Sequence, residues 1–182
     1  EFCNTDFEGA YLIKPFCATD IRGAFIKDYS KEVFEANGLE HNLAEVFYTV
    51  SHKGVIRALH FQRVHEQAKL VRCIKGKVFD DLRPESPTFK KWQGFYLSEE
   101  NMNELYVPEH FAHGYLVLEP SVVSYKCGEK FYGEYDDGIM YNDPDLGVEW
   151  PFDEIGGIEN LIIADKDKNL QSFKEYEEMY LK

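Results

Sequence analysis

The chain has 182 residues, of which 44% are hydrophobic and 29% are charged, a composition typical of a folded domain with its own core. We expect one domain over residues 1–182, because this length is short for two. Acidic residues outnumber basic ones by 33 to 20, and the formal net charge of −13 disfavours general nucleic-acid binders and proteins of anionic membrane surfaces. It is compatible with a small anionic substrate, since a pocket can be basic on an acidic protein.

The sequence favours a cytoplasmic protein. Its apolar runs are only a few residues long, and its first residues lack the basic and apolar regions of a signal peptide. The four cysteines are widely spaced and include no C-x-x-C pair, which favours reduced thiols over disulfides.

The pattern of apolar and turn-forming residues predicts an all-β fold. After an N-terminal strand over residues 20–29, a short helix is expected over residues 30–37, capped by Ser30 and ended by Gly38. Seven strand-like segments follow: residues 54–61, 69–74, 77–82, 91–97, 104–107, 114–118 and 122–127. Turn signals recur about every 8–12 residues, as in β-sandwiches and barrels. A second helix is expected over residues 170–181.

Two of the six histidines stand out as candidates for a functional site. His60 ends the strand pattern 54–61, and strand alternation puts it on the same face as Gln62. Arg57 lies three residues earlier, so a β-bulge or the end of the strand is needed to bring it to the face of His60. His113 lies in a second motif, before Gly114. Taken alone, His60 is equally well read as a hydrogen-bonded core histidine.

These two motifs resemble the cupin double-stranded β-helix, a jelly-roll barrel. In metal-binding cupins the first motif supplies two histidines separated by one residue, followed by a glutamate. Here Gln62 replaces the second histidine and Lys69 stands at the glutamate position. A protonated lysine cannot bind a cation and repels it. We therefore expect no catalytic metal.

Further motifs narrow the resemblance. In chain order they are Asp20-Ile21-Arg22-Gly23, Arg57-Ala58-Leu59-His60-Phe61-Gln62, Gln67-Ala68-Lys69-Leu70-Val71, Phe111-Ala112-His113-Gly114-Tyr115, Phe131-Tyr132, Asn142-Asp143-Pro144 and Trp150-Pro151. Their order and spacing resemble the dTDP-4-dehydrorhamnose 3,5-epimerase family over nearly the whole chain. The resemblance implies a cupin-like barrel with short flanking helices. It also implies a cofactor-independent epimerase of nucleotide-diphosphate 4-keto-6-deoxy sugars, working in deoxysugar or surface-polysaccharide biosynthesis.

The resemblance also implies the catalytic residues. His60 matches the family's base, and an imidazole with a pKa near neutrality suits that task. Asp167 matches the aspartate that orients this histidine, with Asp165 as the alternative if the alignment shifts by two residues. Lys69 matches the lysine that faces the keto oxygen and stabilises the enolate. Tyr132 matches the tyrosine that returns a proton from the opposite face of the ring.

The remaining family positions imply substrate binding and a homodimer. Arg22 matches an arginine that binds the diphosphate, commonly across the dimer interface, and its planar guanidinium suits phosphate oxygens. An N-terminal strand that pairs with a neighbouring subunit would cover an otherwise exposed sheet edge. The full set of expected substrate-binding residues is Arg22, Phe25, Lys27, Glu45, Phe47, Arg57, Gln62 and His113.

Several residues depart from the family pattern. Ala58 replaces a glycine, Glu45 and Phe47 replace a glutamine and an asparagine near the substrate, and Lys27 replaces a glutamate near the nucleotide. These changes predict altered substrate recognition, with a single inverted carbon or a CDP- or GDP-linked sugar as alternatives. A non-catalytic nucleotide-sugar-binding cupin and a metal-dependent cupin enzyme are the competing classes.

Overall fold

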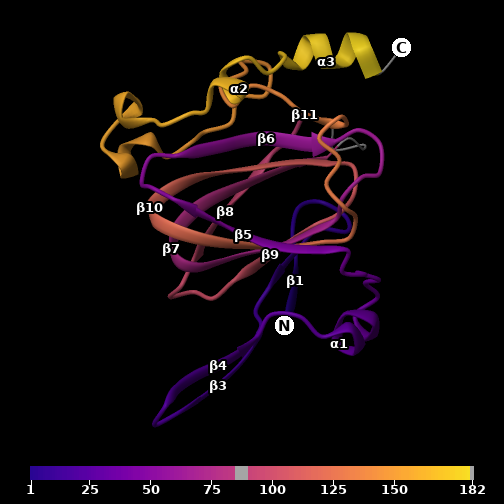
Figure 1. Ribbon diagram of the computed structural model, residues 1–182, viewed down its shortest axis with the longest axis vertical. Helices are drawn as coiled ribbons and strands as arrows, with labels where there is room; N and C mark the ends of the chain where they lie inside the picture. Colours follow the sequence, from indigo (N-terminus) through magenta and orange to yellow (C-terminus); the bar gives the residue numbers. More distant parts are fainter. Residues whose placement is uncertain (85–89, 181–182) are drawn as a thin grey trace.

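The computed structural model describes residues 1–84 and 90–180 and shows a flattened barrel of antiparallel strands (Figure 1). Its strands are β1 (Phe2–Asn4), β2 (Tyr11–Ile13), β3 (Phe16–Asp20), β4 (Gly23–Lys27), β5 (Glu45–Ser51), β6 (Ile56–Gln62), β7 (Lys69–Pro84), β8 (Gln93–Ser98), β9 (Glu104–Val107), β10 (Phe111–Cys127) and β11 (Asp136–Gly138). The main sheet runs β1-β2-β9-β7-β10-β6-β11, with β5 paired to β10 and β8 to β7. The all-β jelly-roll prediction is confirmed.

Two long strands, β7 and β10, pair along almost their whole length and form the middle of the sheet. The sequence predicted breaks within both, and these are wrong: each strand bends and continues. Gly76 has φ +80°, and a Cβ there would lie 2.3 Å from the carbonyl oxygen of Pro120. Gly76 of β7 and Pro120 of β10 therefore lie opposite each other where both strands bend. These two turn-forming residues mark a corner of the barrel and do not end the strands.

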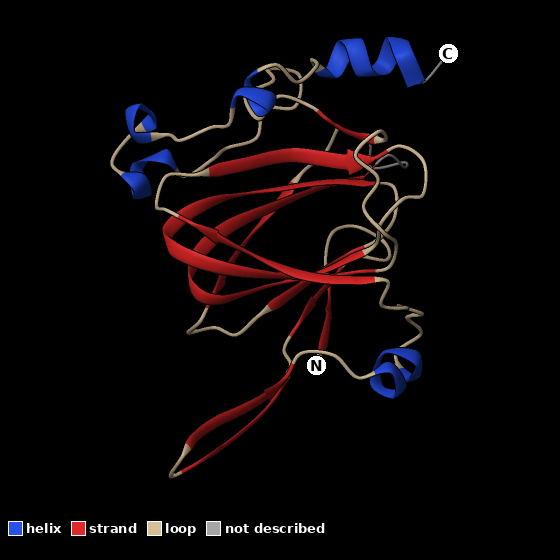
Figure 2. Cartoon of the chain, viewed as in Figure 1, coloured by secondary structure: helices blue, strands red, loops and turns tan. Residues whose placement is uncertain are grey.

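The N-terminal region forms an arm instead of the single strand predicted over residues 20–29. β3 and β4 pair only with each other, and the turn between them contains Ile21 and Arg22. The carboxylate of Asp20 accepts the backbone N–H of Arg22 at 2.8 Å, which stabilises this turn. The hairpin projects away from the barrel (Figure 2).

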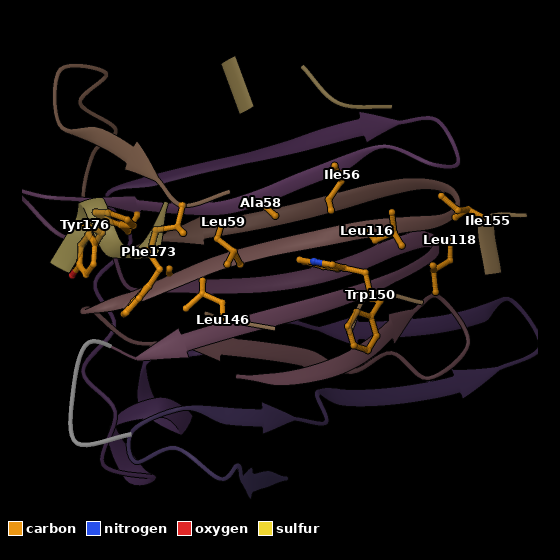
Figure 3. Packing of buried hydrophobic residues seen from close by; sticks show 14 residues of the cluster. Ile56, Ala58, Leu59, Leu116, Leu118, Leu146, Trp150, Ile155, Phe173 and Tyr176 are labelled. Atoms are coloured by element: carbon orange, nitrogen blue, oxygen red, sulfur yellow. The ribbon is translucent and has the colours of Figure 1, made fainter. Parts of the chain in front are cut away.

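Three hydrophobic clusters hold the chain together. The first fills the barrel interior and includes Val71, Leu105 and Tyr115. The second lies on the outer face of β6 and β10, where the C-terminal segment covers it. Figure 3 shows its residues side by side, among them Ile56, Ala58, Leu59, Leu116, Leu118, Leu146, Trp150, Ile155, Phe173 and Tyr176. The third packs α1 (Lys31–Ala36) against β2, β7 and β9.

The two predicted helices are present as α1 and α3 (Phe173–Tyr180), and a further helical turn, α2 (Asp165–Lys168), was not predicted. Phe173 and Tyr176 are the buried residues of α3, as expected from their spacing. No helix among the described residues is long and apolar enough to cross a membrane. No disulfide joins the four cysteines.

Gly114 allows the closest approach of β6 and β10. A Cβ at this position would lie 2.5 Å from the Cβ of Ala58 and 2.7 Å from the carbonyl oxygen of Arg57. We expect Gly114→Ala to destabilise the fold by about 1–3 kcal/mol, because the two strands would have to separate. Urea unfolding of this variant and of Gly128→Ala, whose added Cβ would meet no atom closer than 3.5 Å, tests the prediction. Equal unfolding midpoints for the two variants would contradict it.

Candidate active site

A histidine–aspartate pair lies at the centre of the candidate site. His60, on β6, donates from Nε2 to Oδ2 of Asp167 at 3.0 Å. Asp167 lies in α2, and its side chain is only 8% exposed against 24% for His60. The alternative aspartate, Asp165, is 94% exposed and pairs with Lys168, so the structure favours Asp167 as the partner of the imidazole.

A β-bulge brings Arg57 to the same cavity as His60. His60 faces His113 across the sheet while Arg57 faces Tyr115, so two residues of β6, Ala58 and Leu59, lie opposite the single residue Gly114 of β10. The extra residue on β6 turns the side chain of Arg57 to the same face as that of His60. Strict alternation along the strand would have put the two on opposite faces, as the sequence analysis noted. The guanidinium donates from Nε and Nη2 to Oγ of Ser51 at 3.3 and 3.2 Å, which orients it.

These residues line a cavity of about 560 Å³. The described residues around it are Phe47, Thr49, Val55, Ile56, Arg57, His60, Gln67, Lys69, His113, Tyr125, Phe131, Asp136, Ile162, Ile163, Ala164, Lys166 and Asp167. Lys69 and Gln67 also line a neighbouring cavity of about 430 Å³. His60, Asp167, Lys69, Arg57, His113 and Phe47 are thus six predicted residues that the structure brings together.

Three other predicted residues lie next to the cavity without lining it. Gln62 is buried, and its amide contacts the loop that follows β10. The carboxylate of Glu45 accepts the backbone N–H of Phe131 at 3.1 Å in the same loop. The ring of Tyr132 stacks on that of His65, with centroids 4.7 Å apart. The structure does not bring Tyr132 to this cavity.

The predicted nucleotide-binding residues of the N-terminal region lie on the projecting arm. Arg22 pairs with Asp20 at the tip of the hairpin, and its side chain is 85% exposed. Phe25 and Lys27 belong to β4 and do not line the cavity around His60. These three predicted residues are therefore not among those that the structure brings together around His60.

Sequence reasoning missed two charged residues of the cavity, Asp136 and Lys166, which form an ion pair. Asp136 opens β11, a three-residue Asp-Asp-Gly strand with no strand propensity of its own. It pairs with β6 only because that neighbour offers a free edge. Lys166 could have been predicted, because it directly precedes Asp167 in the sequence.

The described residues contain no group of three histidine, cysteine, aspartate or glutamate side chains arranged to hold a metal ion. The polar groups of the cavity include an imidazole bound to a buried carboxylate, two lysines and an arginine. Such a set can move protons and bind anions. Fold and site together define an acid–base enzyme built into a jelly-roll barrel.

Comparisons with known proteins agree with this class. The family model of dTDP-4-dehydrorhamnose 3,5-epimerase matches residues 4–175. The dTDP-4-dehydrorhamnose 3,5-epimerase of Methanothermobacter thermautotrophicus is 43% identical over 178 residues, covering 96% of this chain and 95% of that one. The chain therefore belongs to the dTDP-4-dehydrorhamnose 3,5-epimerase family.

The solved structures with the same fold include a 3,5-epimerase and a 3'-monoepimerase. The dTDP-6-deoxy-D-glucose-3,5-epimerase of Legionella pneumophila, in complex with dTDP-4-keto-L-rhamnose, has a TM-score of 0.89 and 32% identity, covering 96% of this chain and 93% of that one. A 3'-monoepimerase of Streptomyces bikiniensis, in complex with dTDP-quinovose, has a TM-score of 0.87 and 28% identity, covering 97% and 90%. Both kinds of epimerase thus share this barrel.

Proposed function

We propose that this protein inverts carbon 3, carbon 5 or both in a nucleotide-diphosphate 4-keto-6-deoxy sugar of the dTDP-4-keto-6-deoxyglucose type. The observation that carries the proposal is the His60–Asp167 pair, which lies in one cavity with Lys69 and Arg57. Membership of the family supports the substrate class. A role in rhamnose or another deoxysugar pathway, and a cytoplasmic location, follow as predictions.

The chemistry begins at the ketone, which acidifies the hydrogens on carbons 3 and 5. Because Nε2 of His60 donates to Asp167, Nδ1 is the nitrogen that takes the substrate proton. Asp167 fixes this tautomer and stabilises the imidazolium that forms. The electron pair of the broken C–H bond moves to the ketone oxygen, where the ammonium of Lys69 stabilises the enolate. Arg57 is the predicted ligand of the diphosphate, and Tyr132 is the predicted donor of the proton that reaches the other face of the ring and completes the inversion.

NMR of dTDP-4-keto-6-deoxyglucose incubated with the protein in deuterium oxide tests the proposal. We expect deuterium to replace the hydrogen on carbon 3, on carbon 5 or on both. Exchange at carbon 3 alone would identify a monoepimerase, the second candidate, which the Streptomyces structure favours. Tight binding without exchange at either carbon, with CDP- and GDP-linked sugars also inert, would instead identify a binding protein.

We further propose that the protein is a homodimer in which the arm of one subunit reaches the other. On the arm, Phe16 and Phe25 are 62% and 60% exposed although both are aromatic. Among the described residues β5 pairs with β10 alone, and its residues Val46, Tyr48 and Val50 are each more than half exposed. A second copy would cover both apolar surfaces and the open edge of β5.

Mixing two variants tests this arrangement. We expect Arg22→Ala to bind substrate poorly and His60→Ala to exchange no protons, because each lacks one part of a shared site. A mixed dimer contains one site with both parts, so mixing and re-equilibration should restore about a quarter of the wild-type sites. The rate of deuterium exchange into the sugar at low substrate concentration measures how many active sites are restored. Light scattering that shows a monomer, or a mixture no faster than Arg22→Ala alone, would contradict the proposal.

A further inference from the structure

The arm joins the barrel at two roots, residues 14–15 before β3 and residue 28 after β4. In the part of the chain that the structure describes, β3 and β4 pair with no strand of the main sheet, so their pairing does not fix the direction of the hairpin (Figure 1). At the first root Lys14 lies 3.7 Å from Glu1, and both side chains are more than half exposed. Such exposed ion pairs contribute little to stability. The direction of the arm therefore depends on the second root.

Asp28, the residue that follows β4, is held by two cations of the barrel. Its carboxylate pairs with the guanidinium of Arg72 on β7 and accepts a hydrogen bond from Nζ of Lys126 on β10 at 3.1 Å. The side chains of Arg72 and Lys126 are only 7% and 13% exposed, so water screens these pairs poorly. Charge-assisted hydrogen bonds of this kind are short and directional. They tie the second root of the arm to the middle of the sheet.

The next residue, Tyr29, anchors the same root by a second route. Its ring packs on that of Phe34 with centroids 4.8 Å apart, and its hydroxyl donates to the carbonyl of His41. The buried imidazole of His41 in turn donates from Nε2 to the carbonyl of Lys126 at 2.9 Å. Lys126 is thus connected to the root of the arm both through its side chain and through its backbone.

These cations lie on the opposite face of the sheet from the cavity of their own subunit. Lys69 and Tyr125 line that cavity. Arg72 lies three residues after Lys69, Lys126 directly follows Tyr125, and the two strands pair here without a shift in register. Strand alternation therefore turns the side chains of Arg72 and Lys126 to the outer face. The route from Asp28 to an active site runs through the arm.

We propose that Asp28 is a positioning residue for the active site of the partner subunit. The inference rests on the proposed function and on the homodimer proposed with it. With its carboxylate bound to both cations, Asp28 fixes the angle at which the arm leaves the barrel, and this brings Arg22 to the diphosphate in the partner's cavity. Without that carboxylate the hairpin keeps its own turn, which Asp20 stabilises, but the arm samples more directions. Ordering it on the substrate then costs more entropy.

Asp28→Asn tests this role through binding and turnover measured separately. Calorimetry with dTDP-glucose, which has no ketone and cannot react, should show a Kd about tenfold higher in a dimer of unchanged size, because the arm has to be ordered on binding. The KM should rise to a similar extent, while kcat should stay within about threefold of wild type, because the arm is in place once substrate is bound. Glu154→Gln, which removes another ion-paired carboxylate, 3.1 Å from Lys77, serves as the control and should change neither value.

Mixed dimers show in which subunit Asp28 acts. Mixed with His60→Ala, Asp28→Asn should regain about a quarter of the wild-type sites, because the intact arm of one subunit reaches the intact cavity of the other. Mixed with Arg22→Ala, it should show no gain over the separate variants, since every arm in that mixture is defective. The reverse pattern, with a gain only in the second mixture, would place the effect of Asp28 in the cavity of its own subunit and overturn the inference.

Lys126→Met carries the same test if Asp28→Asn does not fold. It leaves Asp28 paired with Arg72 alone, so the Kd should rise about threefold, with the same pattern in the two mixtures. A folded variant of either kind that binds dTDP-glucose like wild type would refute the inference and leave the proposed function intact. Weaker binding by Asp28→Asn, together with a wild type that exchanges no proton in any 4-keto sugar, would overturn the proposed function and leave the role of Asp28 standing.

Discussion

His60→Ala is expected to slow deuterium exchange at the sugar carbons by roughly 10²-fold or more, because it removes the only imidazole that is bound to the buried carboxylate of Asp167 among the described residues. The ammonium of Lys69 and the guanidinium of Arg57 are hydrogen-bond donors that bind and polarise the substrate, and they do not replace His60 as a base. NMR in deuterium oxide measures the exchange at each carbon.

Asp167→Asn separates two effects of Asp167 on His60: the orientation of the imidazole and the stabilisation of its protonated form. The asparagine can still accept the hydrogen bond from Nε2 of His60, but it carries no charge to stabilise an imidazolium. We expect slower exchange with little change in the binding of dTDP-glucose. His65→Ala serves as the matched histidine control, since its ring stacks on Tyr132 and does not line the cavity. Full exchange activity in His60→Ala would exclude the proposed role of this residue.

The strands could be predicted where apolar and polar residues alternate within a segment and turn-forming residues stand at its ends. The segment 104–107 coincides with β9, and 54–61 differs from β6 by a residue or two at each end. The joined strands β7 and β10 could not be predicted, because a glycine or proline ends a strand in one context and bends it in another. The arm was missed for a related reason: Ile21 and Arg22 form a turn stabilised by Asp20, a side chain whose contact is seen only in the folded hairpin.

The site could be predicted where a single residue of the sequence matched a single role in the family pattern. His60 and Asp167 lie 107 residues apart in the sequence, yet the structure joins them. The role of Tyr132 stays a prediction, since its neighbour Phe131 is the residue of this loop that lines the cavity. In the same loop the backbone N–H groups of Phe131 and Tyr132 donate to the side chains of Glu45 and Gln62, and neither bond leaves a local signal in the sequence.

A buried charged cluster behind the arm carries the largest expected effect on stability. Glu104, on β9, is fully buried beside Asp28, Arg72 and Lys126. Arg72 and Lys126 both pair with Asp28, the residue that follows the arm. Burial raises the pKa of Asp28, but the two cations outweigh it, so this pKa lies below its ordinary value. Asp28 is therefore the anion of the cluster.

Glu104 is expected to be neutral in the folded protein at pH 7. Burial, with the charge of Asp28 as the next cause, raises the pKa of Glu104 to about 9, against an ordinary value of 4.5. Between these values the folded state holds a proton that the unfolded state releases, so stability falls as the pH rises from about 4.5 to about 9. Keeping the carboxyl protonated at pH 7 costs roughly 3 kcal/mol.

Glu104→Gln should therefore stabilise the protein at pH 7, by up to about 3 kcal/mol, because the amide has nearly the same shape and no proton to bind. The gain should vanish near pH 4.5, and the variant should show a flatter dependence of stability on pH between 5 and 9. Urea unfolding at several pH values measures both effects, with Glu100→Gln on the exposed surface as the control. A variant less stable than wild type at pH 7 would show that Glu104 is ionised and bound to Arg72 and Lys126. In that case the cluster would tie the arm to the barrel through two anions instead of one.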